Sequence, residues 1–210
     1  MSNDTLSFLA LGDSYTIGER VDSTLRWPVQ LASRLREEGL HISDPLIIAQ
    51  TGWTTDELEA GIQAAGPSGP FDLVSLLIGV NNQYRGWDVE EYRIQLRALL
   101  NQAVAFAGGR AEGVLVLSIP DWGVMPFAAG RDRSAIASQI DSFNRVKVEE
   151  AAALGVRFVD ITGISREAPE DPNLVAEDGL HPSGFQYARW VDAALPVAKE
   201  LLEGVGGDAN

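Results

Sequence analysis

The sequence has no cysteine, and histidine occurs only twice among its 210 residues. The absence of cysteine excludes disulfide bonds and metal sites built from thiolates. The sequence also has no cluster of cysteine and histidine ligands of the kind that holds structural zinc. A glycine-rich phosphate loop is absent too, because the segment from Gly12 to Ile17 lacks the lysine that such a loop requires. We therefore expect neither a metal ion nor a cofactor.

Basic residues are also scarce: 16 lysines and arginines stand against 30 aspartates and glutamates, which gives a net charge of −14. Such a surface repels phosphate backbones and anionic lipid headgroups, so we expect no nucleic-acid partner and no stable membrane association. No apolar run is long enough for a membrane span, and the first residues carry no basic group that would begin a signal peptide. We expect a cytoplasmic protein. The sequence gives no indication of the oligomeric state.

Hydrophobic residues make up 45% of the chain, enough for a single domain over residues 1–210, with a polar tail from about residue 204. Short apolar runs predict strands, and amphipathic segments with capping residues at their starts predict helices. The predicted strands lie at 6–11, 46–49, 72–78, 114–119 and 156–160. The predicted helices lie at 27–38, 54–65, 88–106, 134–154 and 183–202, and residues 15–24 are predicted to be a loop.

The alternation of strands and helices requires a parallel sheet that is covered by helices on both faces. Because crossover connections between parallel strands are right-handed, only a few strand orders are compatible with it. We expect an α/β fold, a flavodoxin-like three-layer α/β/α sandwich whose five-stranded parallel sheet has the order 2-1-3-4-5. In this order the first and third strands flank the switch point, where open α/β sheets bind their ligands. Ser14 and Asn81 follow these two strands in the sequence.

The polar residues after the predicted strands include the parts that acyl transfer by a serine requires. Such a reaction needs a nucleophile, a base within hydrogen-bond reach, an acid that orients the base, and hydrogen-bond donors for the oxyanion. Ser14 is the candidate nucleophile, His181 is the candidate base, and Asp178 is the candidate acid of this catalytic triad. The candidate oxyanion-hole donors are the backbone N–H groups of Ser14 and Gly52 and the side-chain amide of Asn81.

Each of these residues also has a plain structural interpretation. Ser14 can cap the start of the following helix, Gly52 can belong to a turn, and Asn81 can be a turn or cap residue. A structural role of this kind does not require all of them to follow strands of one sheet. Their joint occurrence at the ends of the predicted strands favours the catalytic interpretation.

Four short motifs give the chain its resemblance to a known family. They are Gly12-Asp13-Ser14-Tyr15, Thr51-Gly52-Trp53, Gly79-Val80-Asn81 and the segment from Asp178 to His181. In this order they resemble the SGNH subgroup of the GDSL esterase/lipase (acylhydrolase) family over nearly the whole chain. The resemblance implies a serine hydrolase of esters or thioesters with a flavodoxin-like fold, a shallow site and no metal. Asn82 and Trp53 depart from the family pattern, which usually has Asp at the first position and often Ser at the second.

Aromatic residues in the loops beyond the strand ends predict the substrate pocket. The pocket candidates are Tyr15, Trp53, Asn82, Tyr84, Trp122, Met125 and Phe127. Because the chain has no lid-like insertion, the predicted substrates are small-molecule carboxylic esters with short acyl chains, including acetylated sugars or thioesters. Two other functions stay open. One is an acyltransferase of the same family, in which a sugar hydroxyl replaces water, and the other is a flavodoxin-like binding module without catalysis.

Overall fold

The apolar runs of the sequence form one parallel sheet in the computed structural model, which describes residues 5–205. The strands are β1 (Phe8–Gly12), β2 (Leu46–Ala49), β3 (Leu73–Leu77), β4 (Val114–Leu117) and β5 (Arg157–Val159). Their order across the sheet is β2-β1-β3-β4-β5. The predicted strand order and the predicted parallel pairing are confirmed.

Burial explains why β1, β3 and β4 consist almost entirely of apolar residues. Every residue of these three strands is buried, because helices cover the sheet on both faces. The edge strands β2 and β5 are only partly buried. The register pairs Gly12 with Ala49 of β2 and with Leu77 of β3. The loops that follow these three strands, which carry candidate site residues, therefore begin at the same edge of the sheet.

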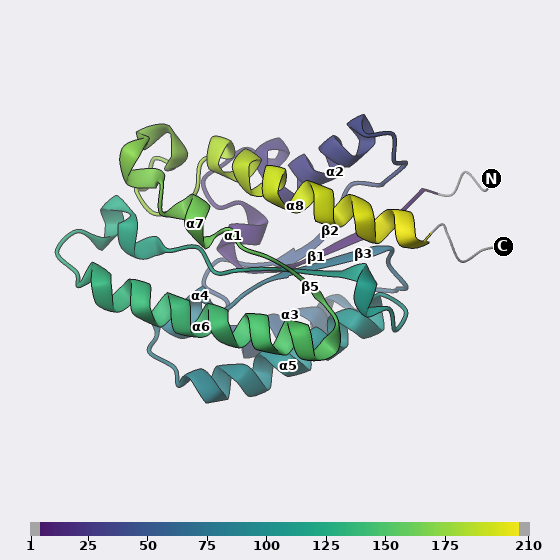
Figure 1. Cartoon of the computed structure of the whole chain (residues 1–210), viewed down its shortest axis with the longest axis horizontal. Helices are drawn as coiled ribbons and strands as arrows, with labels where there is room; N and C mark the ends of the chain where they lie inside the picture. The colour runs from purple at the N-terminus through teal and green to yellow at the C-terminus, as the bar shows by residue number, and fades with distance from the viewer. Residues whose placement is uncertain (1–4, 206–210) are drawn as a thin grey trace.

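Helices form a layer on each face of the sheet (Figure 1). One layer contains α2 (Trp27–Glu37) and α8 (Gly184–Val205), which pack against each other. The other layer contains α3 (Thr55–Ala65), α5 (Val89–Phe106) and α6 (Arg133–Leu154), and α5 contacts both of the others. This arrangement is the predicted three-layer sandwich. Among the helices of residues 5–205, none combines the length and the apolar character that a membrane crossing requires.

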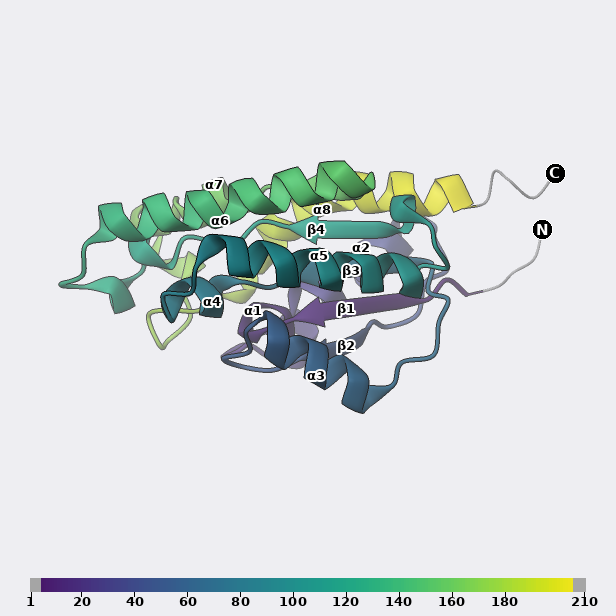
Figure 2. The same cartoon turned by 90° about the horizontal axis from the view of Figure 1, so that it is seen from below.

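Short helices occupy parts of the chain that the sequence did not predict to be helical. The predicted loop at 15–24 overlaps both α1 (Ser14–Ile17) and the 3-10 helix η1 (Ser23–Leu25), because local helical turns satisfy backbone groups next to the buried sheet. Helix α4 (Val80–Tyr84) follows β3, and Figure 2 shows the arrowhead of β1 beside α1. Helix α8 continues through Val205, three residues beyond the predicted end of this helix. Residues 206–210 of the predicted tail lie outside the described residues.

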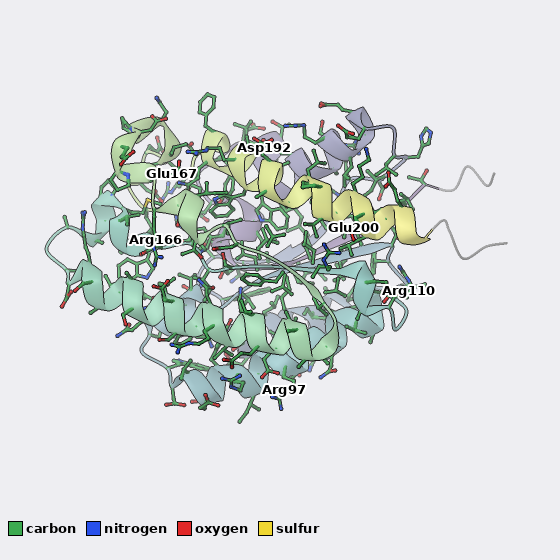
Figure 3. All side chains as sticks on the ribbon, viewed as in Figure 1. Arg97, Arg110, Arg166, Glu167, Asp192 and Glu200 are labelled. Atoms are coloured by element: carbon green, nitrogen blue, oxygen red, sulfur yellow. The ribbon has the colours of Figure 1, made fainter. Side chains whose placement is uncertain are left out.

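Arg166 fixes the long connection between β4 and α6. It follows α7 (Thr162–Ser165), and Figure 3 shows it between α7 and α6. Its Nε lies 2.9 Å from Oδ2 of Asp121, at the start of the connection, and its Nη2 lies 2.7 Å from Oδ1 of Asp141 on α6. Because this connection also carries Trp122 and Phe127, the two ion pairs help to hold those rings at the end of the sheet where β1 and β3 finish.

Candidate active site

Ser14 lies at the first position of α1, immediately beyond the end of β1. The chain can turn here because Gly12 has no side chain: a Cβ at this position would lie 2.4 Å from the carbonyl oxygen of Leu77 on the neighbouring strand. Asp13 caps α1, and its Oδ1 accepts a hydrogen bond from the N–H of Tyr15 at 3.0 Å. The N–H of Ser14 has no acceptor within its own helix, as is general for the first turn. This N–H is therefore available to a ligand.

Asp178 holds the ring of His181 in one orientation. Nδ1 of His181 lies 2.6 Å from Oδ2 of Asp178, and Oδ1 of Asp178 accepts the N–H groups of Leu180 at 2.9 Å and His181 at 3.0 Å. Burial raises the pKa of Asp178, but the bonds from the His181 ring and from both N–H groups outweigh burial, so this pKa lies below its usual range. An ionised carboxylate bound to Nδ1 leaves Nε2 as the ring nitrogen that can accept a proton.

Ser14 and His181 line one small cavity at the end of the sheet. Its volume is about 190 Å³. Its lining residues are Ser14, Tyr15, Thr51, Gly52, Val80, Asn81, Tyr84, Trp122, Phe127, Leu180 and His181. In the described part of the chain there is no direct hydrogen bond between the Ser14 and His181 side chains, and in ligand-free sites such bonds are often long. The cavity collects Ser14, Gly52, Asn81 and His181, and through His181 also Asp178.

Gly52 and Asn81 both lie in the wall of the cavity. Gly52 has a φ of +86°, which favours glycine whatever the free space around it. Its carbonyl oxygen accepts a hydrogen bond from Nη2 of Arg85 at 2.7 Å. Asn81 lies in the first turn of α4, and its Nδ2 donates to the carbonyl oxygen of Trp53 at 2.9 Å. The amide of Asn81 has a second hydrogen, which this bond leaves free for a ligand.

Asn82 does not belong to the pocket, contrary to the prediction from sequence. Its side chain is fully buried, its Oδ1 accepts the N–H of Thr55 at 3.2 Å, and its Nδ2 donates to Oγ1 of Thr55 at 2.7 Å. Thr55 is the first residue of α3, so this amide satisfies polar groups at the start of that helix. Two adjacent asparagines on one short helix point in different directions, and only Asn81 reaches the cavity.

Trp53 and Met125 also fail to line the cavity that the sequence assigned to them. The ring of Trp53 packs against α3, where a Cβ on Gly61 would lie only 2.1 Å from it. Met125 is buried in a small apolar cluster with Ala168 and Leu174. The other pocket candidates, namely Tyr15, Tyr84, Trp122 and Phe127, do line the cavity. Sequence position placed all six residues near the site, but only packing decides which rings face it.

Three lining residues were missed by the analysis of the sequence. Thr51, Val80 and Leu180 all lie in the cavity wall. Each belongs to one of the four motifs, beside or between the residues that carry the chemistry. The signal was therefore present: the motifs bring their intervening side chains to the same place as their polar residues.

Asp13, the residue before Ser14, is a buried acid, and the charge of a buried base, Lys147 on α6, acts on it. Asp13 and Lys147 are both almost fully buried, and Nζ of Lys147 donates to the carbonyl oxygen of Leu117 at 2.7 Å. Burial raises the pKa of Asp13 to about 7, against the smaller lowering by the N–H of Tyr15 and the charge of Lys147. Burial likewise lowers the pKa of Lys147 to about 7, and the charge of Asp13 opposes this only in part. Neither residue lines the cavity.

Across residues 5–205, no group of three or more histidine, aspartate or glutamate side chains is arranged to hold a metal ion. The groups available for chemistry in the cavity are a hydroxyl, an imidazole held by a carboxylate, and the N–H donors of the strand ends.

Comparison with known families agrees with this arrangement. The profile of the GDSL-like Lipase/Acylhydrolase family matches residues 10–208, and the chain belongs to this family. No curated protein sequence matches the chain significantly.

Solved structures share the fold at low sequence identity. The structure of TesA is similar with a TM-score of 0.72 and 22% identity, over 93% of this chain and 99% of that chain. The W215I variant of Axe2, an acetyl xylan esterase from Geobacillus stearothermophilus, gives a TM-score of 0.70 and 22% identity over 92% and 96% of the two chains. The psychrotrophic esterase EstA from Pseudoalteromonas sp., inhibited by monoethylphosphonate, gives a TM-score of 0.69 and 16% identity over 94% of this chain and 98% of that chain. All three confirm the α/β fold of the SGNH hydrolases.

Proposed function

We propose that the protein is a serine esterase that hydrolyses short-chain carboxylic esters through an acyl-enzyme on Ser14. The observation that carries the proposal is the His181 ring, held by Asp178 at 2.6 Å in the cavity that Ser14 also lines. The assembled groups match the nucleophile, base, orienting acid and oxyanion donors of acyl transfer. Membership of the GDSL-like family supports ester hydrolysis as the reaction class.

In the proposed acylation step, Oγ of Ser14 attacks the ester carbonyl carbon while Nε2 of His181 takes the hydroxyl proton. The carbonyl oxygen becomes an oxyanion, which accepts hydrogen bonds from the N–H groups of Ser14 and Gly52 and from the amide of Asn81. The tetrahedral intermediate collapses as the C–O bond to the alcohol breaks. His181 gives its proton to the departing alcohol, and the acyl group stays on Ser14.

In the proposed deacylation step, water repeats the attack on the acyl-enzyme. His181 takes a proton from water, the resulting oxyanion uses the same donors, and collapse returns the proton to Oγ of Ser14. The carboxylic acid then leaves. Asp178 keeps its charge throughout, and it stabilises the imidazolium that forms twice in each cycle.

The cavity supports small substrates. A volume of about 190 Å³ has room for a short acyl group but lies below the 300–1,000 Å³ or so of sites that enclose drug-sized ligands. Much of its wall is apolar, with the rings of Tyr84, Trp122 and Phe127 among the lining. One structural neighbour is an acetyl xylan esterase, which is consistent with acetyl or similarly short acyl groups.

Replacement of Ser14 by alanine tests the proposal. Ser14→Ala should lower the hydrolysis of p-nitrophenyl acetate by on the order of 10⁶-fold, because a triad acts as a unit. It should also prevent labelling by a serine-reactive phosphonate, with mass spectrometry locating the wild-type adduct on Ser14. Ser138→Ala, at an exposed serine of α6, serves as the matched control and should keep both properties. Retention of more than about a tenth of the activity by folded Ser14→Ala would falsify the assignment.

A further inference from the structure

Arg131 lies over three of the aromatic rings that line the candidate active site. Its guanidinium carbon is 5.4 Å from the ring centre of Tyr84, 5.3 Å from that of Trp122 and 5.3 Å from that of Phe127. All three distances are within the range of cation–π attraction, about 6 Å. Tyr84 and Phe127 are roughly half exposed and Trp122 is buried, so this group of rings runs from the solvent into the cavity. Arg131 is therefore held at the outer end of the cavity wall.

The three rings are themselves held in place. The indole N–H of Trp122 donates to Oε1 of Gln83 at 2.8 Å, and its ring meets those of Tyr84 and Phe127 edge to face. The N–H of Phe127 donates to the carbonyl oxygen of Gly179, within the segment that carries Asp178 and His181, at 2.9 Å. The platform under Arg131 is thus connected to the segment that bears the candidate base. A group bound by Arg131 would have a defined position relative to the cavity.

The charge of Arg131 has no carboxylate partner among residues 5–205. Arg20, Arg85 and Arg166, near the same end of the sheet, each lie within ion-pair distance of a carboxylate. The adjacent Asp132 does not pair with Arg131; its Oδ1 caps α6, where it accepts the N–H of Ala135 at 3.0 Å and the hydroxyl of Ser134 at 2.6 Å. Other arginines of residues 5–205 also lack such a partner, but Arg131 is distinguished by its place over the aromatic rings of the cavity wall.

Stacking leaves the donors of Arg131 available. A guanidinium has five N–H groups in its plane, and in the described structure Arg131 uses a single side-chain bond, Nη2 to the hydroxyl of Tyr84 at 3.3 Å. Arg131 is exposed, so the remaining N–H groups are accessible at the mouth of the cavity. A planar cation that is fixed on aromatic faces and has free edges suits two parallel hydrogen bonds to a carboxylate or phosphate.

We infer that Arg131 is a subsite for an anionic group of the substrate, so that the preferred esters carry a carboxylate or phosphate beyond the scissile bond. The inference rests on the proposed esterase function and specifies the substrate class of that site. A local cation also has a clear purpose here, because a net charge of −14 repels anionic substrates. The anionic group belongs either to the acyl chain or to the alcohol, and the test separates these two sources.

The test compares matched pairs of esters. For the acyl side the pair is mono-p-nitrophenyl glutarate and p-nitrophenyl pentanoate; for the alcohol side it is 4-acetoxybenzoate and its methyl ester. In Arg131→Gln, the ratio of kcat/KM for the anionic to the neutral ester should fall about tenfold in one pair, as expected for a charge-assisted hydrogen bond. The pair in which it falls identifies the part of the substrate that Arg131 binds. Arg131→Lys keeps the charge without the planar fork, so its ratio should lie between those of the wild type and of Arg131→Gln.

A matched control and a salt series complete the experiment. Arg145→Gln removes the same charge from an exposed position on α6 and should leave both ratios within twofold of the wild type. High salt should reduce the preference of the wild-type enzyme for the anionic ester, because screening weakens exposed charges. The inference would be overturned if the ratio of kcat/KM for the anionic to the neutral ester stayed constant in both pairs for Arg131→Gln, whether or not both esters lost activity equally. Arg131 would then only support the aromatic rings. Failure of the wild-type protein to hydrolyse any of the four esters would instead count against the proposed function itself.

Discussion

The wall of the cavity and the layer of residues directly beneath it contain similar polar groups in opposite surroundings. After β1, Ser14 faces the cavity while the preceding Asp13 is buried behind it. After β3, Asn81 faces the cavity while the following Asn82 is buried against Thr55. At both places one residue along the chain separates a group that can meet a ligand from a group that serves the fold. The type of residue alone therefore does not assign a role here. The role depends on whether the side chain points toward the cavity or into the core.

The two aspartates near the site show what these surroundings do to a charge. Asp178 at the cavity accepts bonds from the His181 ring and from two N–H groups, and its pKa is lowered despite partial burial. Asp13 beneath the cavity has one oxygen without a partner in the described structure, and burial raises its pKa to about 7. Hydrogen bonds to the ionised form dominate in the first case, and loss of solvent dominates in the second.

The largest expected effect on activity within this comparison belongs to Asp178. Asp178→Asn should lower kcat by on the order of 10⁴-fold, because an amide does not hold the His181 ring in the reactive tautomer and lacks the charge that stabilises the imidazolium. Steady-state kinetics with p-nitrophenyl acetate provides the measurement. Asp192→Asn, an exposed aspartate on α8, controls for the loss of one charge. A loss below about tenfold in folded Asp178→Asn would remove Asp178 from the role of orienting acid.

Asn81 should show the next largest effect on turnover. Asn81→Ala removes one proposed oxyanion donor and should lower kcat by about 10²- to 10³-fold, roughly 3 to 4 kcal/mol. The Michaelis constant should change much less, because the bond is stronger in the tetrahedral state than in the ground state. The purely structural interpretation of Asn81 predicts the reverse: a lower melting temperature with kcat nearly unchanged. Both quantities are to be measured on the same preparation.

Asp13 should make the free energy of unfolding depend on pH. Since its folded pKa of about 7 lies above the usual 3.8, the folded state holds a proton that the unfolded state has lost between these values. The contribution of Asp13 to the free energy of unfolding therefore falls as the pH rises from about 4 to about 7, by at most roughly 4 kcal/mol. Asp13→Asn removes this loss and keeps an oxygen for the N–H of Tyr15.

Urea unfolding at about pH 4 and about pH 8 measures this effect. Asp13→Asn should gain stability over the wild type as the pH rises. The gain is reduced by the loss of the attraction between the Asp13 carboxylate and the charge of Lys147. Asp178→Asn should show no such gain between these pH values, because a lowered folded pKa stabilises the wild type from about pH 4 upward and this contribution is lost only in more acidic solution. Parallel curves for the two variants would contradict the contrast between the cavity wall and the layer beneath it.

Asn82 should have the smallest effect of the four. Asn82→Ala leaves the N–H and the hydroxyl of Thr55 without their amide partner, which should lower the free energy of unfolding by about 2 kcal/mol. The kcat of the folded variant should change far less than that of Asn81→Ala. Asn101→Ala, at an exposed position on α5, is the matched control. If Asn82→Ala lowered kcat more than Asn81→Ala, the proposed oxyanion donor would have been assigned to the wrong asparagine.

The strand order and the identity of the chemical groups were predictable from the sequence. Apolar runs long enough to be buried on both faces can only form a covered parallel sheet, and right-handed crossovers leave few orders for five of them. The positions of Ser14 and Asn81 after neighbouring strands follow from that order. The motif from Asp178 to His181 contains both its carboxylate and its imidazole within one turn, so their contact is local and readable from spacing.

Which side chains face the cavity could not be predicted from the sequence, because it depends on packing between distant segments. Trp53 and Met125 lie near the site in sequence, yet one packs on Gly61 and the other on Ala168 and Leu174. The stacking of Arg131 on three rings joins residues from α4 and from the connection after β4, and no local pattern encodes it. Direction depends on how distant segments pack around each side chain, since a change in packing turns the same residue from the cavity toward the core. That information exists only once the segments have come together.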